Sequence, residues 1–349
     1  IYIDSLELEK YITSSQMTIY EALDKLNNTS QLFQIIVDEN NHFVGTLTDG
    51  DIRRGLLSGY KLDESVKKCM KFNPISGQIK NEAENIEKIN QVDSYPLFLP
   101  IINENLILQG VLIKNITTSI SNALIVAGGL GSRLGSLTKH KPKPMLHIDG
   151  RPILEHCINK LEEAGIKTIY VSVNHMSEQI IDFIKSKKFK SDIIPIKETT
   201  KLGTIGSLYL IKKRINYPLL VMNADLVTSL SLSTLISFYN SENVDGVITA
   251  ATYETKVPYG ILKYNQIGQL QSIEEKPTIK NLVAAGVYIL NKNISDLLIK
   301  QEYLDMPELL EKAISNGCNI SIFPIHEKWK DIGNNKDYYD TKKMNFNRK

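Results

Sequence analysis

The stretch Ala127-Gly128-Gly129-Leu130-Gly131-Ser132-Arg133-Leu134 decides the fold of the second half of this chain, and Pro142-Lys143-Pro144 follows it closely. Residues 123–126 before it are all apolar and predict a buried strand, whereas residues 151–156 predict the start of a helix. A glycine-rich turn after a strand lets backbone N–H groups approach a phosphate, because no Cβ stands in the way. With an arginine and a lysine in the same segment to neutralise a polyphosphate, the pattern predicts a nucleoside triphosphate site.

The composition of the whole chain predicts a soluble globular protein that is long enough for two domains. The chain has 349 residues, of which 42% are hydrophobic and 23% charged, and its formal net charge is only +2. So small a net charge predicts no general affinity for nucleic acid or for an anionic membrane. The three cysteines, Cys69, Cys157 and Cys318, form no Cys-x-x-Cys pair, which favours free thiols over disulfides or zinc. Because the first residues include acids and no apolar run reaches membrane-spanning length, we expect a cytoplasmic protein.

An internal repeat marks the first third of the chain. Residues 31–47 and residues 96–112, which are 65 positions apart, both predict a strand, a polar turn and a second strand. An amphipathic helical pattern precedes each copy. The repeat suits two copies that bury one another, and the polar segment 114–122 after them indicates a linker. We therefore predict one domain over residues 1–118 and another over residues 122–349.

The repeated unit resembles the tandem CBS-domain pair, a regulatory or dimerising module whose members often bind adenine nucleotides. Its first copy contains Gly45-Thr46-Leu47-Thr48-Asp49-Gly50-Asp51-Ile52. The resemblance implies that Thr48 contacts a phosphate and that Asp51 accepts hydrogen bonds from ribose hydroxyls, so AMP or ATP is an expected ligand. The second copy has Ile113 and Ile116 at these positions, which predicts a degraded site. The same Thr-Asp-Gly-Asp run is also a good turn and helix N-cap, and that interpretation stays open.

Strand and helix patterns alternate in the second half of the chain. Residues 168–173, 192–196 and 218–222 predict strands, and residues 177–188 predict a helix. This alternation predicts a mostly parallel sheet flanked by helices, with ligands bound beyond the carboxyl ends of its strands. A dinucleotide-binding domain is disfavoured, because Leu134 stands where the third glycine of that fingerprint belongs and no acidic residue follows the next strand.

Residues 122–349 resemble the nucleotidyltransferase family that activates sugar 1-phosphates. The glycine-rich stretch and Pro142-Lys143-Pro144 match the opening motifs of this family, and later landmarks appear in the family's order. These landmarks are Leu202-Gly203-Thr204-Ile205-Gly206-Ser207, Asn223-Ala224-Asp225, Tyr259-Gly260, Glu274-Glu275-Lys276-Pro277, Ala285-Gly286-Val287-Tyr288 and Trp329-Lys330-Asp331-Ile332-Gly333. The resemblance implies an α/β fold with a Rossmann-like, mostly parallel mixed sheet, preceded by the α+β CBS module.

The resemblance also implies roles for individual residues. The catalytic set would be Arg133 on the β- and γ-phosphates, Lys143 near the α-phosphate, Asp225, and Lys276 on the sugar phosphate. The nucleotide would contact Ala127, Gly128, Gly129, Gly131, Ser132, Arg133, Gly203 and Thr204, and the sugar phosphate would contact Gly260, Glu275, Lys276 and Gly286. Asp225 and Asp331 would hold Mg²⁺, or Mn²⁺ in its place, since hard oxygen ligands suit such ions. Taken singly, Asp225 is also a good helix cap, Asp331 a good turn residue, and Glu275 with Lys276 a surface ion pair.

The combined architecture resembles bacterial CBS-containing guanylyltransferases. We therefore expect Mg²⁺-dependent transfer of GMP from GTP to glucosamine 1-phosphate or a related hexose 1-phosphate, giving a nucleotide sugar for glycan or nonulosonic acid biosynthesis, and pyrophosphate. Mannose 1-phosphate as the acceptor, and uridylyl, thymidylyl or cytidylyl transfer, remain alternatives, because no residue identified in the sequence recognises the base. The alternative from another class is a non-catalytic nucleotide sensor of the same fold. A homodimer or higher oligomer is also expected.

Overall fold

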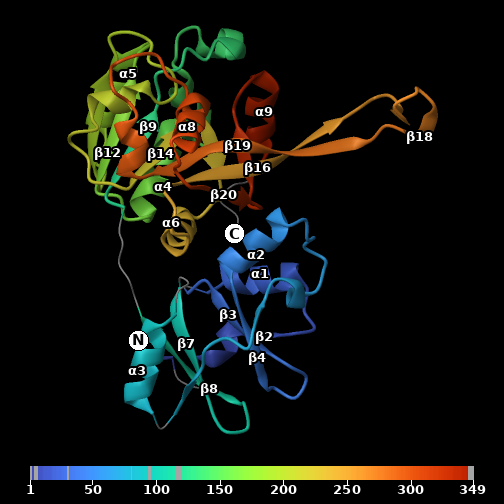
Figure 1. The fold of residues 1–349 in the computed structure, drawn as a ribbon. Helices are drawn as coiled ribbons and strands as arrows, with labels where there is room; N and C mark the ends of the chain where they lie inside the picture. The colour runs from blue at the N-terminus through green and yellow to red at the C-terminus, as the bar shows by residue number, and fades with distance from the viewer. Residues whose placement is uncertain are drawn as a thin grey trace.

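The computed structural model describes residues 2–3, 7–29, 31–79, 81–92, 96–114 and 120–344. Its N-terminal part contains two four-stranded sheets of matching design (Figure 1). In each sheet a short strand pairs in parallel with a longer strand. The longer strand then forms an antiparallel hairpin with the next strand in the chain. The elements are β1 (Tyr2–Ile3), β2 (Ile12–Ser14), α1 (Ile19–Asn27), β3 (Phe33–Val37), β4 (Phe43–Thr48), α2 (Asp49–Leu57), β5 (Lys71–Phe72), β6 (Gly77–Gln78), α3 (Glu82–Asn90), β7 (Leu97–Ile102) and β8 (Leu108–Lys114).

The two sheets confirm the predicted internal repeat. One has the order β2-β3-β4-β5 and the other the order β1-β8-β7-β6. Strand β1 therefore pairs with β8 at the edge of the second sheet, as β5 pairs with β4 at the edge of the first. Phe33 of β3 and Phe98 of β7, at equivalent repeat positions, stack with ring centroids 4.0 Å apart, and the copies share one apolar core. The predicted linker residues 115–119 and the predicted domain ends at residues 1, 118 and 349 lie outside the described residues, so those boundaries stay predictions.

A seven-stranded sheet forms the centre of the second part of the chain. Its order is β13-β12-β9-β14-β19-β16-β20, and only β19 runs antiparallel to its neighbours. The predicted mostly parallel sheet is thereby confirmed. The strands are β9 (Asn122–Val126), β12 (Thr168–Val173), β13 (Asp192–Lys197), β14 (Leu219–Asn223), β16 (Gly246–Lys256), β19 (Thr278–Leu290) and β20 (Ile320–Ile325).

Helices cover both faces of this sheet, because each presents an apolar stripe at helical spacing. One face carries α4 (Ile153–Glu163), α5 (Ser177–Ser186), α6 (Leu232–Ser241) and part of α9 (Asn335–Lys343); the other carries α7 (Lys292–Asp296), α8 (Met306–Ser315) and the 3₁₀-helix η5 (Gly206–Leu210). Smaller elements at the edge of the sheet are η3 (Ser132–Thr138), η4 (Lys143–Met145), β10 (His147–Ile148), β11 (Arg151–Pro152), β15 (Leu226–Thr228) and β21 (Trp329–Asp331). Within the described ranges, every helix is too short or too polar to cross a membrane.

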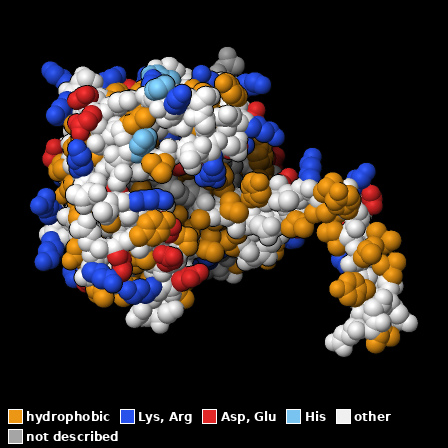
Figure 2. Space-filling view, turned by 90° about the horizontal axis from the view of Figure 1, so that it is seen from above, with side chains coloured by type: hydrophobic (Ala, Val, Ile, Leu, Met, Phe, Trp, Pro, Cys, Tyr) orange, Lys and Arg blue, Asp and Glu red, His pale blue; other side chains and the backbone are white. Residues whose placement is uncertain are grey.

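The hairpin of β16 and β19 continues far beyond the sheet as a projecting arm, which we define as residues 253–281 (Figure 1). Its ladder runs without interruption from the pair Ala250 and Ala284 out to the pair Lys256 and Thr278. Beyond that pair, β17 (Ile261–Tyr264) and β18 (Leu270–Glu274) form the tip. Figure 2 shows apolar side chains exposed along this arm.

The two parts of the chain meet where α2 packs against α6 and β20. Arg53 of α2 is only 1% exposed at this junction. Its guanidinium donates to Asp49 in its own helix, and to Glu327 and the carbonyl oxygen of Pro324 in the second part. The guanidinium carbon also lies 3.7 Å from the centre of the Phe323 ring. One buried arginine therefore joins the CBS-like part to the segment that follows β20.

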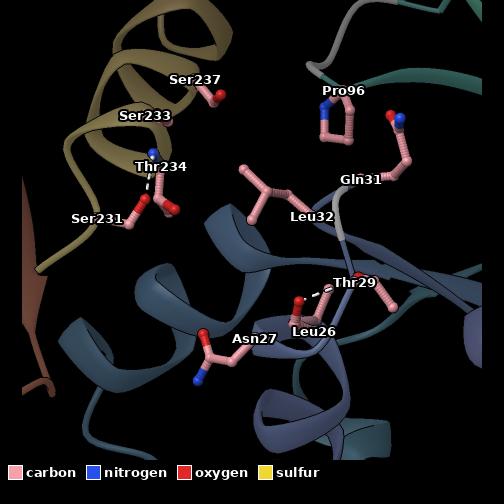
Figure 3. Close-up of a pocket in the computed structure, with 10 residues that line it drawn as sticks. All are labelled: Leu26, Asn27, Thr29, Gln31, Leu32, Pro96, Ser231, Ser233, Thr234 and Ser237. Atoms are coloured by element: carbon pink, nitrogen blue, oxygen red, sulfur yellow. Dashed lines mark hydrogen bonds between the residues drawn. The ribbon is translucent and has the colours of Figure 1, made fainter. Parts of the chain in front are cut away.

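A cavity of about 420 Å³ lies at the same junction (Figure 3). Serine and threonine side chains at the start of α6 form one wall, and Leu32 and Pro96 lie opposite them. The described residues that line the cavity include no Lys or Arg. The cavity is therefore a poor match for a polyphosphate, which needs nearby cationic groups.

Candidate active site

The glycine-rich stretch forms the turn between β9 and η3, at the carboxyl end of a central strand of the sheet. Gly131 adopts a left-handed conformation with φ of 64°, and a Cβ there would lie 3.1 Å from both Lys143 Cβ and Thr138 Cγ2. Only glycine fits this position without strain. Gly129, in contrast, borders open space, so a ligand can approach its backbone closely. The loop thus has the exposed backbone that phosphate binding requires.

Lys143, Asp225 and Asp331 meet in one cluster beside this loop. Lys143 is 8% exposed, and its ammonium nitrogen lies 2.5 Å from Asp225 Oδ2 and 3.7 Å from Asp331 Oδ1. Asp225 directly precedes β15, which pairs with β21 so that Leu226 lies opposite Asp331. This strand pairing brings together two carboxylates that are far apart in the sequence. The structure therefore joins three of the predicted site residues.

The same cluster has a donor set that fits a divalent cation. The Oδ1 atoms of Asp225 and Asp331 are buried and make no hydrogen bond within the described part of the chain. Burial and the neighbouring Asp225 carboxylate raise the pKa of Asp331, because both disfavour its negative charge. Mg²⁺ commonly uses one or two protein carboxylates together with water and substrate phosphates. Among the described residues, no group of three His, Cys, Asp or Glu side chains offers an all-protein metal site.

Arg133 lies at the edge of this cluster. Its side chain is exposed in the first turn of η3, and one guanidinium nitrogen lies 3.7 Å from the point that a Cβ of Gly333 would occupy. Gly333 is two residues beyond Asp331, so the guanidinium stands near the carboxylate pair. An exposed guanidinium in this position can form two parallel hydrogen bonds with a phosphate that enters from solvent.

The turn that contains Gly203 and Thr204 packs against the start of α8. A Cβ at Gly203, where φ is 78°, would lie 2.4 Å from the carbonyl oxygen of Leu304. The Thr204 amide donates to Asp305 Oδ1 at 2.9 Å, and its hydroxyl accepts a hydrogen bond from the Met306 amide at 2.7 Å. The polar groups of Thr204 thus hold the N-terminus of α8, a contact that the sequence pattern did not predict.

The predicted sugar-phosphate residues lie in two separate places. Gly286 is in β19 beside the cluster, where a Cβ would lie 2.9 Å from Asn223 Nδ2. Gly260, Glu275 and Lys276 lie together on the arm: a Cβ at Gly260 would be 2.9 Å from Glu275 Oε2, and Lys276 Nζ is 4.0 Å from Glu275 Oε1. β19 begins at Thr278, two residues after Lys276, and eight residues of strand, a span of roughly 27 Å, separate Thr278 from Gly286. The arm residues are therefore out of reach of the cluster in the same chain.

Thr48 and Asp51 line a cavity of about 250 Å³ in the N-terminal part. They also cap α2, because the Thr48 amide and hydroxyl donate to Asp51 Oδ2 and the Asp51 amide donates to Thr48 Oγ1. Arg54 pairs with Asp51 Oδ1 at 2.7 Å, and Lys71 lines the same cavity. The helix-cap interpretation is confirmed, and nucleotide binding stays a prediction. In the second copy, Ile116 lies outside the described residues.

Glu198 is a candidate site residue that the sequence reasoning missed. It follows β13 and is 6% exposed, and a Cβ at Gly128 in the glycine-rich loop would lie 3.0 Å from its Oε1. Oε1 makes no hydrogen bond within the described residues, whereas Oε2 accepts one from the Leu202 amide at 3.4 Å. Burial raises the pKa of Glu198. Its position just after a parallel strand was the one signal available, since sites form at the carboxyl ends of such strands.

Comparisons with known proteins identify the family of the second part of the chain. The model of the nucleotidyl transferase family matches residues 122–347, well over half of the chain. The chain belongs to the nucleotidyl transferase family. A CBS-domain model matches residues 11–58, which contain most of the first copy of the repeat.

Relatives of this nucleotidyl transferase include proteins named as mannose-1-phosphate guanylyltransferases. The chain is 30% identical over 224 residues to the putative mannose-1-phosphate guanyltransferase of Sulfolobus acidocaldarius, a match that covers 62% of this chain and 61% of the relative. It is 33% identical over 225 residues to mannose-1-phosphate guanyltransferase 2 of Candida glabrata, covering 62% of each chain. The chain thus spans less than two-thirds of the length of these relatives.

Solved structures of similar fold extend the comparison. HddC from Yersinia pseudotuberculosis is 29% identical, with a TM-score of 0.51 over 64% of this chain and 99% of HddC, and the complex of HddC with GMP-PN matches equally well. A putative glucose-1-phosphate thymidylyltransferase from Bacillus anthracis, 17% identical with a TM-score of 0.52, shares the fold over 65% of this chain and 96% of its own. The α/β fold expected of a nucleotidyl transferase is therefore confirmed.

Proposed function

We propose that this nucleotidyl transferase family member transfers a nucleotidyl group from a nucleoside triphosphate to a sugar 1-phosphate. A phosphate oxygen of the sugar attacks the α-phosphorus of the nucleotide and forms a new P–O bond. The bond from the α-phosphorus to the oxygen that bridges to the β-phosphorus breaks, and pyrophosphate leaves. The cluster of Lys143, Asp225 and Asp331 beside the glycine-rich loop is the observation that carries this proposal. No protein nucleophile is needed, because the acceptor phosphate is already anionic near neutral pH.

The work of the protein in this reaction is positioning and charge neutralisation, since two polyanions must meet. The open backbone at Gly129 would bind phosphate oxygens, and Arg133 would stabilise the charge on the departing pyrophosphate. Lys143, held by Asp225 Oδ2 at 2.5 Å, would direct its remaining N–H donors at the α-phosphate. Because Lys143 is 8% exposed, solvent screens its charge only weakly, which strengthens its effect on the transition state.

The cofactor in this proposal is Mg²⁺, with Mn²⁺ as a substitute. Asp225 and Asp331 would hold the ion through their Oδ1 atoms, which make no hydrogen bond within the described residues. When bound, the ion supplies positive charge to the phosphates of the nucleotide. The loop and Lys143 would orient those phosphates from the two sides of the site.

The nucleotide we propose is GTP, and Glu198 supports this choice. A carboxylate only accepts hydrogen bonds, and guanine is the base that offers two adjacent donors, N1–H and N2–H₂, on one edge. No other common base presents two adjacent donors on one edge, so a carboxylate there would disfavour the other bases. Glu198 Oε1 is buried against the glycine-rich loop without a hydrogen-bond partner among the described residues. HddC, which is 29% identical, has been crystallised with GMP-PN.

The acceptor we propose is a hexose 1-phosphate. Mannose 1-phosphate is favoured by the names of the relatives that are 30% and 33% identical to this chain. Glucosamine 1-phosphate, the acceptor expected from the sequence, is the second candidate.

A matrix of the four common ribonucleoside triphosphates and dTTP against hexose 1-phosphates, read by pyrophosphate release, tests this proposal. We expect GTP with one hexose 1-phosphate to give the largest kcat/KM. Glu198→Gln should lower kcat/KM for GTP by roughly 10- to 100-fold, the loss of about 1.5–3 kcal/mol of charged hydrogen bonding, and should spare the other nucleotides. Glu178→Gln, which only removes an exposed ion pair with Lys197, is the matched control. A uniform loss for all nucleotides in Glu198→Gln would contradict base recognition by Glu198.

We further propose that AMP or ATP binds the cavity lined by Thr48 and Asp51 and alters catalysis. Lys71 in that cavity offers a charge for a phosphate. The same helix, α2, that begins at these residues carries Arg53, which binds Glu327 at 3.0 Å. Glu327 lies four residues before Asp331 in the chain, so a shift of α2 would reach the cluster.

Calorimetry with AMP and with ATP tests this second proposal. Asp51→Ala should weaken binding by about tenfold or more, because the ribose would lose a charged acceptor. That substitution also removes the cap of α2, so Thr18→Ala, which removes the equivalent capping box of α1 away from the cavity, is the control. Equal binding by wild type and Asp51→Ala, or no binding by wild type, would contradict the proposal.

A further inference from the structure

The cavity at the junction of the two parts is large enough for a small organic ligand (Figure 3). The end of α1 and the loop after it form one wall, and the first two turns of α6 form the other. Its volume of about 420 Å³ lies within the range of small-molecule sites, roughly 300–1,000 Å³. A single water molecule occupies only about 30 Å³ of liquid. We call this space the junction cavity.

The internal repeat gives the junction cavity a counterpart in the same part of the chain. Asn27 lines the junction cavity, and Val92, which is 65 positions later, lines the cavity that contains Thr48. The repeat equivalent of Thr48 is Ile113, which is 3% exposed and belongs to the apolar core. Polar groups at the junction cavity come from α6 of the second part instead. The two cavities of the repeat therefore suit different ligands.

The lining of the junction cavity is polar but uncharged. Among the described residues that form it, none has an ionisable or an aromatic side chain. Its polar groups are the amides of Asn27 and Gln31 and the hydroxyls of serine and threonine residues, all of which can both donate and accept. A phosphate would find no cation there, and a nucleobase would find no aromatic ring on which to stack. The lining favours an uncharged ligand that is rich in hydroxyl groups.

Thr234 has a buried hydroxyl that can bind such a ligand. The residue is 7% exposed, and its amide donates to Ser231 Oγ at 3.2 Å. Its own hydroxyl makes no hydrogen bond within the described part of the chain. The same is true of the side chains of Asn27, Gln31 and Ser237. Because an unpaired buried polar group costs free energy, a ligand that pairs with the Thr234 hydroxyl gains affinity.

We propose that the junction cavity binds an uncharged hexose unit, which bridges the CBS-like part and α6. The hydroxyls of a hexose donate and accept, as the amides and hydroxyls of the cavity do. The C–H face of its ring matches the apolar surface of Leu32 and Pro96. This site is separate from the proposed reaction, because binding and stability alone test it.

The bound hexose would lie next to the contacts that join the two parts. The Asp49 amide donates to the carbonyl oxygen of Leu32 at 3.2 Å, and the Asp49 carboxylate binds Arg53. A ligand that contacts both walls should therefore strengthen the junction. Saturating hexose should raise the thermal unfolding midpoint of the wild type, since a ligand that binds only the folded state stabilises it.

Calorimetry on the full chain tests the site with mannose, glucose and their methyl glycosides as probes. Tighter binding of the free hexoses would assign the site to a monosaccharide, and tighter binding of the glycosides would assign it to the end unit of a glycan. Glucuronate, in which a carboxylate replaces a hydroxymethyl group of glucose, should bind roughly tenfold more weakly than glucose, because no cation lines the cavity. No binding of any hexose, or tighter binding of glucuronate or adenosine than of every hexose, would overturn the proposal.

Three variants locate the ligand. Thr234→Val removes the unpaired hydroxyl and keeps the shape of the side chain, so hexose affinity should fall by roughly 2- to 10-fold while the unfolding midpoint of the free protein does not fall. Asn27→Ala should weaken binding to a similar extent, and Asn40→Ala, an exposed residue in the turn between β3 and β4, is its matched control. Ser237→Leu fills the cavity and should abolish both binding and the stabilisation by hexose. Unchanged affinity in Thr234→Val and Asn27→Ala, or binding that survives in Ser237→Leu, would place the hexose elsewhere and overturn the site.

Discussion

Replacing Asp225 with asparagine should lower the rate of pyrophosphate release by roughly 10³-fold or more, which corresponds to about 4 kcal/mol of transition-state stabilisation. The substitution removes a negative charge while keeping the size of the side chain. Asp225 Oδ2 lies 2.5 Å from the Lys143 ammonium, so both the orientation of that lysine and the proposed cation depend on this carboxylate. Steady-state pyrophosphate release measures the effect, with circular dichroism as a check that the variant is folded.

Asp337→Asn is the matched control for this substitution. Asp337 is a neighbouring acid that caps α9, and its Oδ2 accepts from the Asn334 amide at 3.1 Å. Asparagine can keep such a cap, so the rate should stay within about threefold of wild type, as expected for loss of a surface charge. Equal losses in both variants would contradict the placement of Asp225 at the reacting phosphate. A rate above one tenth of wild type in Asp225→Asn would contradict it as well.

Replacing Arg53 with methionine should destabilise the junction between the two parts by about 3–5 kcal/mol, the cost of breaking a buried ion pair from one side. The Asp49 and Glu327 carboxylates, now bound by Arg53 at 2.6 and 3.0 Å, would stay buried without their cation. The stacking of the guanidinium on Phe323 would also be lost. Urea unfolding followed by the fluorescence of Trp329, the single tryptophan and two residues from Glu327, reports on this region.

Arg54→Met provides the comparison for the Arg53 variant. Arg54 pairs with Asp51 and with Glu242 across the same junction, but its side chain is 46% exposed. Its loss should cost no more than about 1 kcal/mol. A similar loss in both variants would show that burial of Arg53 contributes nothing special to the junction.

The Arg53 pair also predicts a dependence of stability on pH. Burial opposes ionisation of Glu327, yet Arg53 and His326 hold its pKa below the ordinary value of 4.5. Because the folded-state pKa lies below the unfolded-state value, the stabilisation is present above about pH 4.5 and is lost as the pH falls through the folded-state pKa. Arg53→Met should therefore lose less stability on acidification than the wild type does.

Local patterns predicted the sheet well, because parallel strands and their helices follow one another in sequence. The pattern over residues 168–173 predicted a strand with the bounds that β12 has in the structure. The antiparallel β19 and the arm were not predicted, since strand pairing depends on contacts outside the local pattern. The family motifs, which follow one another in the expected order along the sequence, predicted that Lys143, Asp225 and Asp331 share one site. The structure confirms that these three side chains meet.

Other features had no signal in the sequence. The order of motifs along a sequence gives no distances between them in space. Nothing in the sequence therefore indicated that Lys276 would lie on an arm far from Gly286. Glu198 is a single acid after a strand, and only its burial under Gly128 distinguishes it from a surface glutamate. Arg53 sits in an ordinary capped helix, and its partner Glu327 is too distant in the chain for any periodicity to reveal.

The stoichiometry of the reaction tests the central claim most directly. Wild-type protein with Mg²⁺, GTP and a hexose 1-phosphate should form pyrophosphate and a guanosine diphosphate sugar in equal amounts, as phosphorus NMR and mass spectrometry can quantify. Omitting the sugar phosphate should stop pyrophosphate release, because the attacking oxygen belongs to the sugar phosphate. Pyrophosphate formed without the sugar, or no nucleotide sugar from any pairing of nucleotide and hexose 1-phosphate, would contradict the account.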